Sequence, residues 1–283
     1  MIYADHNATS PLRPEARAAM VQALEIGANP SSVHGPGRAA RKVLERARAQ
    51  VADAVGASAK DLVFTSGGTE ANALALRGAV AQLGGKATLL VSAIEHDAVR
   101  ENAQGIDVKQ EKIPITPFGQ VDLAWLAARL ADWGPENGAP ILVLMLANNE
   151  TGVVQPVAEA SALVREKGGL IHCDAVQGLG KIQVNTALLG VDYLALSAHK
   201  CGGPQGVGAL WIRPGAPLKP QLLGGGQERS VRSGTENLAG AAGFGAAAEM
   251  ADKALDRAQA AGSKRSAFES KLVSLAPDLV VFG

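Results

Sequence analysis

Three groups of polar residues each follow a short apolar run that is typical of a buried strand. The first group, Ser66–Glu70, reads Ser-Gly-Gly-Thr-Glu and opens a segment with helical periodicity. Its two glycines allow a ligand to approach the backbone closely, and the helix N-terminus presents free N–H groups and a positive dipole. This pattern fits phosphate binding at the segment, and an ordinary capped helix start explains the same residues equally well.

A carboxylate and a lysine follow two other apolar runs. Asp174 comes directly after Gly169–Cys173, and Lys200 comes shortly after Tyr193–Ser197. A carboxylate at this place can keep a buried pyridinium nitrogen protonated, and a partly desolvated lysine can form a Schiff base with an aldehyde. Each residue also has a plain structural explanation, since Asp174 would cap the next turn and Lys200 would be an exposed loop lysine. Lys181 is a rival lysine, but it lies farther from any strand end.

Strands and helices alternate along the chain and must position these groups. The runs typical of buried strands are Leu62–Thr65, Ala87–Ser92, Ile141–Leu146, Gly169–Cys173, Tyr193–Ser197 and Gly208–Ile212. The amphipathic segments between them include Gly37–Ala54, Thr69–Leu83, Leu123–Ala131 and Val157–Lys167. This alternation predicts an α/β fold with a mostly parallel central sheet sandwiched by helices. Ligands of such sheets bind beyond the carboxyl ends of the strands, so the Ser66–Glu70 segment, Asp174 and Lys200 would form one pyridoxal 5'-phosphate (PLP) site.

The C-terminal part of the sequence departs from this alternation. Gly224–Asn237 is typical of a long glycine-rich and charged loop, and Leu238–Ala260 of an alanine-rich helix. Leu279–Phe282 begins like a strand. We therefore expect a large PLP-binding domain over residues 15–240. Residues 1–14 and 241–283 would contribute to a smaller α+β domain that they do not complete.

The composition is that of an ordinary folded protein, with 47% hydrophobic and 19% charged residues among 283. Lys and Arg number 27, as do Asp and Glu, and this balance disfavours a nucleic-acid partner. The two cysteines, Cys173 and Cys201, match neither a zinc site nor a secreted disulfide scaffold, and no metal is expected. No segment has the pattern of a signal peptide or of a membrane span, so we expect a cytoplasmic protein with no membrane partner.

The sequence resembles the cysteine desulfurases of the nitrogen-fixation and iron–sulfur-cluster-assembly group, within the class V aminotransferases. The matching segments, in the family's order, are Tyr3–Thr9, Asn29–His34, Thr65–Glu70, Glu95–His96, Asn148–Gly152, His172–Gln177, Ser197–Lys200 and Arg232–Thr235. The resemblance implies fold type I of the PLP-dependent transferases. It also implies conversion of L-cysteine to L-alanine, with sulfur transferred as a persulfide to an acceptor or scaffold protein for iron–sulfur cluster or thio-cofactor biosynthesis.

The resemblance further implies a role for each matching residue. Lys200 would hold the cofactor covalently and take a proton from the substrate, and His96 would stack on the ring and move protons. Asp174 would pair with the pyridinium nitrogen, Gln177 with the ring hydroxyl, and Asn149 would lie near that side of the ring. The phosphate would be held by Gly68, Thr69, Ser197 and His199. Thr235 would reach the phosphate of a neighbouring subunit, which implies a homodimer with shared sites.

The family's nucleophilic cysteine lies in a Ser/Gly-rich loop of the small domain, and no such loop occurs in this sequence. Cys173 and Cys201 are poor substitutes, because a thiol in apolar surroundings has a raised pKa and is inert. Two alternatives therefore stay open. The first is another class V activity, such as selenocysteine lyase or transamination, and the second is a shortened non-catalytic homologue that acts as a dimerisation partner or scaffold.

Overall fold

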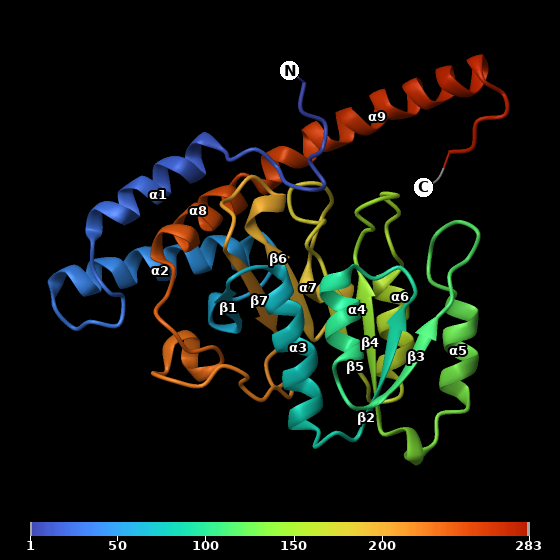
Figure 1. Cartoon of the computed structure of the whole chain (residues 1–283), viewed down its shortest axis with the longest axis horizontal. Helices are drawn as coiled ribbons and strands as arrows, with labels where there is room; N and C mark the ends of the chain where they lie inside the picture. Colours follow the sequence, from blue (N-terminus) through green and yellow to red (C-terminus); the bar gives the residue numbers. More distant parts are fainter. Residues whose placement is uncertain (1, 282–283) are drawn as a thin grey trace.

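A seven-stranded sheet forms the centre of the computed structural model, which describes residues 2–281 (Figure 1). Its strands are β1 (Leu62–Thr65), β2 (Ala87–Ser92), β3 (Lys109–Ile113), β4 (Ala139–Met145), β5 (Leu170–Asp174), β6 (Tyr193–Ser197) and β7 (Gly208–Ile212). They lie in the order β1-β7-β6-β5-β4-β2-β3, and β7 runs in the opposite direction to the other six strands of this sheet. The predicted α/β fold with a mostly parallel sheet is therefore confirmed.

Helices cover both faces of the sheet. The described helices are α1 (Pro14–Ile26), α2 (Gly35–Asp53), α3 (Gly68–Gln82), α4 (Asp97–Gln104), α5 (Leu123–Ala131), α6 (Val157–Arg165), α7 (Thr186–Leu189), α8 (Leu238–Glu249) and α9 (Ala251–Leu275). Short 3-10 turns are η1 (Ala59–Asp61), η2 (Pro135–Asn137), η3 (Ala198–Lys200) and η4 (Gln227–Ser230). None of the helices in the described part of the chain is long and apolar enough to cross a membrane.

The central strands are apolar along their length because each face packs against a layer of helices. In β4, Leu142 and Leu144 belong to a core shared with α2, α5, α6 and α8, whereas Ile141 and Val143 belong to a core shared with α3 and α4. Successive side chains of a strand point to opposite faces, so one continuous apolar run supplies both cores. This is why the unbroken apolar runs of the sequence identify the inner strands correctly.

The edge strand β3 is absent from the strands predicted by the sequence. Its residues read Lys-Gln-Glu-Lys-Ile, and only Ile113 is fully buried. Charged side chains on an edge strand discourage pairing with other chains, and they also remove the apolar run that marks a strand. Two predicted strands also shift by one or two residues. The strand predicted at Ile141–Leu146 spans Ala139–Met145, and the one predicted at Gly169–Cys173 spans Leu170–Asp174, because Asp174 pairs with Met145 and Ala195 on either side.

The C-terminal helix is divided into two. α8 packs against α1 and α2, and its glycines allow that approach, since a Cβ on Gly245 would lie 2.7 Å from the Cα of Ala47. α9 then extends away from the sheet (Figure 1). The strand predicted at 279–282 is wrong for residues 279–281, which form no strand, and Phe282 lies outside the described residues. The division into domains at residue 240 stays a prediction.

Candidate active site

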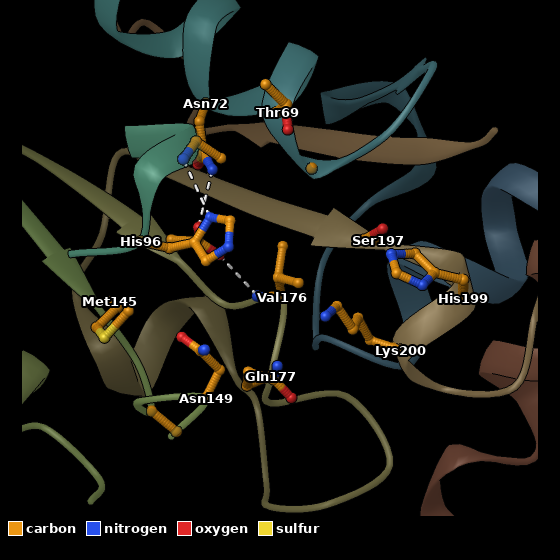
Figure 2. A pocket seen from close by; sticks show the side chains of 14 residues that line it. Thr69, Asn72, His96, Met145, Asn149, Val176, Gln177, Ser197, His199 and Lys200 are labelled. Atoms are coloured by element: carbon orange, nitrogen blue, oxygen red, sulfur yellow. Dashed lines mark hydrogen bonds between the residues drawn. The ribbon is translucent and has the colours of Figure 1, made fainter. Parts of the chain in front are cut away.

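A cavity of about 230 Å³ lies at the carboxyl ends of β4, β5 and β6, beside the start of α3 (Figure 2). The predicted site residues that line it are Gly68, Thr69, His96, Asn149, Asp174, Gln177, Ser197, His199 and Lys200. They come from segments spread over more than 130 residues of sequence, and the parallel strands bring them to one edge of the sheet. Thr235 lies elsewhere and is described below.

The start of α3 forms one wall of the cavity. The first turn of a helix leaves backbone N–H groups without partners inside the helix, so this wall presents donors to an anion. A Cβ on Gly68 would lie 2.7 Å from the Cγ2 of Val176, so this position admits only glycine without a shift of its neighbour. Glu70 fixes the loop before the helix, because its Oε2 accepts from the backbone N–H of Ser66 at 2.7 Å and its Oε1 from Nε of Arg232 at 2.6 Å.

Asp174 forms the floor of the cavity, and only 7% of it is exposed. Its Oδ1 accepts from the backbone N–H of Val176 at 2.9 Å, and its Oδ2 accepts from Nδ2 of Asn72 at 2.8 Å. Burial raises the pKa of Asp174 above its usual value, and these two donors together with His96 and Lys200 act in the opposite direction. The carboxylate still has lone pairs for a further donor in the cavity.

Asn72, which lines the cavity, and His172, which contacts Asn72, were not among the predicted site residues. Nε2 of His172 lies 2.8 Å from Oδ1 of Asn72. Asn72 gives its NH₂ group to Asp174, so its oxygen must accept from His172, which therefore carries a proton on Nε2. Burial lowers the pKa of His172 to about 3, which keeps the ring neutral. Asn72 belongs to the first turns of α3, one helical turn after Thr69, and that spacing was the available signal.

Lys200 approaches the cavity from the side opposite to Asn72 (Figure 2). It ends the short turn η3, directly after β6. Its Nζ donates to the backbone oxygens of Asn7 and Ala8 at 2.6 and 2.9 Å. Burial lowers the pKa of Lys200, although Asp174 and Asp5 partly oppose this. A lysine with a lowered pKa has a larger fraction of free amine, which is the reactive form.

The N-terminal segment closes one side of the site through Asn7. The backbone oxygen of Asn7 accepts from Nε2 of Gln177 at 2.8 Å as well as from Lys200. Its side chain joins Lys181 to Asn149: Oδ1 accepts from Nζ of Lys181 at 2.9 Å, and Nδ2 donates to the backbone oxygen of Asn149 at 3.0 Å. The matching segment Tyr3–Thr9 was part of the resemblance, but no site role was expected for Asn7.

His96 lies at the N-terminus of α4 and points into the cavity (Figure 2). Its Nδ1 accepts from the backbone N–H of Ala98 at 3.0 Å, so the neutral ring carries its proton on Nε2. The neighbouring Glu95 is buried, and its Oε1 accepts from the backbone N–H of Met145 at 2.7 Å. Burial, together with the nearby Asp174, raises the pKa of Glu95 well above its usual value.

A comparison with known protein families covers nearly the whole chain. The model of the family described as aminotransferase class-V matches residues 2–280. The chain belongs to this family. Relatives and solved structures point to one group within the class V aminotransferases.

Two cysteine desulfurases illustrate the similarity. The one from Cereibacter sphaeroides is 43% identical over 259 residues, which cover 88% of this chain and 65% of that relative. Cysteine desulfurase 2 from Trichormus variabilis is 37% identical over 287 residues, which cover 100% of this chain and 71% of that relative. The chain thus spans slightly less than two thirds of the length of the Cereibacter relative. The resemblance to cysteine desulfurases is confirmed.

Solved structures give the same result for the fold. A NifS-like protein from Rickettsia africae has a TM-score of 0.90 at 34% identity, and the match covers 100% of this chain and 78% of that one. A structure described as SspA in complex with cysteine has a TM-score of 0.80 at 30% identity, over 88% of this chain and 72% of that one. The predicted fold, fold type I of the PLP-dependent transferases, is confirmed.

In this class V chain Thr235 and the two cysteines lie outside the cavity. Thr235 lines a smaller hollow together with Glu228 and Arg232, and its expected role toward a neighbouring subunit stays a prediction. Burial raises the pKa of the Cys173 thiol well above its usual value, and that of Cys201 to about 11. The Sγ of Cys201 donates to the backbone oxygen of Ala198 at 3.2 Å. Neither thiol is placed or charged as a nucleophile for this site.

Proposed function

We propose that this chain forms the cofactor site of a PLP-dependent cysteine desulfurase, which converts L-cysteine to L-alanine and passes the sulfur on as a persulfide. The observation that carries the proposal is the convergence of Asp174, Lys200 and the start of α3 on one cavity. The similarity to cysteine desulfurases supports cysteine as the substrate.

The residues that line the cavity fit PLP at three of its functional groups. The phosphate would bind the N–H groups at the start of α3, where Gly68 leaves room for close approach. The pyridine nitrogen would bind Asp174, a buried carboxylate with lone pairs to spare. The aldehyde would bond to Lys200, whose pKa is lowered by burial. Gln177, Asn149, Ser197, His199 and His96 would complete the site.

When bound, PLP supplies an electron sink for negative charge at the substrate Cα. Asp174 would hold a proton at the pyridine nitrogen and so make that sink effective. Lys200 would take the proton from the substrate Cα at its Nζ, since its lowered pKa favours the free amine. His96 has its proton on Nε2 and would donate it to, or exchange it with, the thiol of the substrate.

Another class V activity, such as selenocysteine lyase or transamination, stays open as an alternative. Selenocysteine lyase chemistry depends less on an enzyme thiol, and neither Cys173 nor Cys201 lines the cavity. The further expectations from the sequence stay with the proposal: a homodimer in which Thr235 serves the neighbouring site, a cytoplasmic location, and a sulfur-acceptor or scaffold protein. The non-catalytic alternative predicts that the chain does not bind PLP.

The test is alanine release by the purified chain with PLP and a reductant, from L-cysteine and in parallel from L-selenocysteine. The control is Lys200→Ala. Alanine from L-cysteine that depends on Lys200 supports the desulfurase. Alanine from L-selenocysteine alone favours the lyase. A protein that turns yellow with PLP but releases no alanine supports the cofactor site and shows that residues 1–283 do not suffice for turnover, and one that stays colourless overturns the proposal.

A further inference from the structure

Lys181 lies behind the cavity wall and contacts the site through two side-chain amides. It follows β5 in the loop that carries Gln177. Its Nζ donates to Oδ1 of Asn7 at 2.9 Å and to Oε1 of Gln177 in a short hydrogen bond. An ammonium group has three donors and no acceptor. Both amides must therefore turn their oxygens toward Lys181.

This requirement decides which way each amide faces. An amide oxygen and nitrogen have nearly the same shape, so only their partners distinguish the two orientations. With its oxygen on Lys181, Gln177 has its NH₂ group free to donate to the backbone oxygen of Asn7 at 2.8 Å. One N–H of that group remains, and Gln177 lines the cavity. The remaining N–H is thus available as a donor to a ligand.

Lys181 occupies a half-buried position near a second lysine, and both conditions disfavour its charged form. Burial and the neighbouring Lys200 lower the pKa of Lys181 to about 8. In the part of the chain that the structure describes, no carboxylate forms an ion pair with Lys181, and its recorded partners are the two neutral amides. Because this half-buried ammonium contacts two amides rather than a carboxylate, its interaction acts on the orientation of those amides.

We propose that Lys181 is a positioning residue that fixes the amide of Gln177 with an N–H toward the cavity, so that the site accepts a ligand with an anionic ring oxygen. This inference rests on the proposed function, in which the ring oxygen of PLP is that group. Without Lys181, the amide of Gln177 can rotate and present its oxygen, which repels an anionic oxygen. A hydrogen bond to a charged group is then lost, and PLP should bind about ten- to a hundred-fold more weakly.

The test measures the dissociation constant of PLP by titration of the yellow absorbance, in the wild type and in Lys181→Met, Lys181→Gln, Gln177→Ala and the double variant. Lys60→Met removes an exposed lysine and serves as the matched control. We expect the loss in Lys181→Met, a smaller loss in Lys181→Gln because its amide can still donate, and wild-type binding in Lys60→Met. We also expect Lys181→Met to cost much less affinity once Gln177 is alanine, since only its contact with Asn7 then remains.

Two outcomes would overturn the inference. The first is wild-type PLP affinity in Lys181→Met. The second is a loss of PLP affinity in the double variant that equals the sum of the losses in the two single variants. Additive losses would mean that Lys181 acts independently of Gln177. Should Lys181→Met not fold, the graded variant Lys181→Gln in the Gln177→Ala background decides the same question. A wild type that binds no PLP would overturn the proposed function itself, which distinguishes the two failures.

Discussion

His172→Gln should remove part of the dependence of stability on pH. His172 is completely buried in β5, and burial lowers the pKa of its ring to about 3. In the unfolded chain the pKa of a histidine is about 6.5. Below that pH the unfolded chain takes up a proton that the folded protein does not. The free energy of unfolding therefore falls as the pH drops from about 6.5 toward 3.

The size of the effect follows from these two pKa values. Where only the unfolded chain is protonated, the free energy of unfolding changes by about 1.4 kcal/mol per pH unit, so His172 accounts for a loss of about 2 kcal/mol between pH 7 and pH 5. Both pH values lie above the folded pKa of about 3, so this loss depends mainly on the unfolded value. Glutamine does not titrate, and its amide can donate to Oδ1 of Asn72 as the ring now does.

Urea unfolding of the cofactor-free protein, followed by tryptophan fluorescence from pH 8 to pH 5, measures this difference. The curves of the wild type and His172→Gln should run parallel between pH 8 and pH 7, where histidine is neutral in both states. At pH 5 the variant should have lost about 2 kcal/mol less than the wild type. Equal losses in the two proteins would refute the reasoning, since His172 would then be charged in the folded state too.

Three other substitutions or reagents test the fold and the site. Asp192→Ala removes a fully buried carboxylate that accepts from Arg213, Arg165 and the N–H of Ile171, and should lower the free energy of unfolding in urea by about 3 kcal/mol. Gly208→Ala puts a Cβ 2.5 Å from backbone carbon of the loop before α3, so thermal unfolding should shift down and PLP affinity should fall. The thiols of Cys173 and Cys201 should react with a thiol reagent only after unfolding, because both are buried and their pKa values are raised.

The sequence predicts most of the sheet because the inner strands are apolar on both faces. β4 and β6 are recognised from their composition alone, since neither face meets water. β3 fails for the opposite reason: it lies at the edge, and its charged residues look like a loop. The break between α8 and α9 at Met250 is also invisible in the sequence, because alanine-rich residues continue on both sides of it.

The residues of the site also divide into those that the sequence predicts and those that it does not. Asp174 and Lys200 were predicted from their positions at strand ends, which the topology of a parallel sheet brings to one edge. Asn7 was missed, because its contacts with Gln177 and Lys200 join segments 170 and 193 residues apart. The periodicity of a sequence does not show which loop packs over the end of which strand. Only the packing of the folded chain shows that the N-terminal segment reaches the cavity.

The surroundings of Asp174 argue that this part of the molecule serves a ligand rather than stability. Within residues 2–281 its carboxylate accepts from neutral donors, Asn72 and Val176, and forms no ion pair. Burial raises its pKa because two neutral hydrogen bonds do not replace the water that the carboxylate has lost. A protonated ring nitrogen beside this carboxylate would interact with it favourably, and Asp174 has lone pairs left to accept from it. The position of Asp174 therefore fits a ligand-binding role better than a purely structural one.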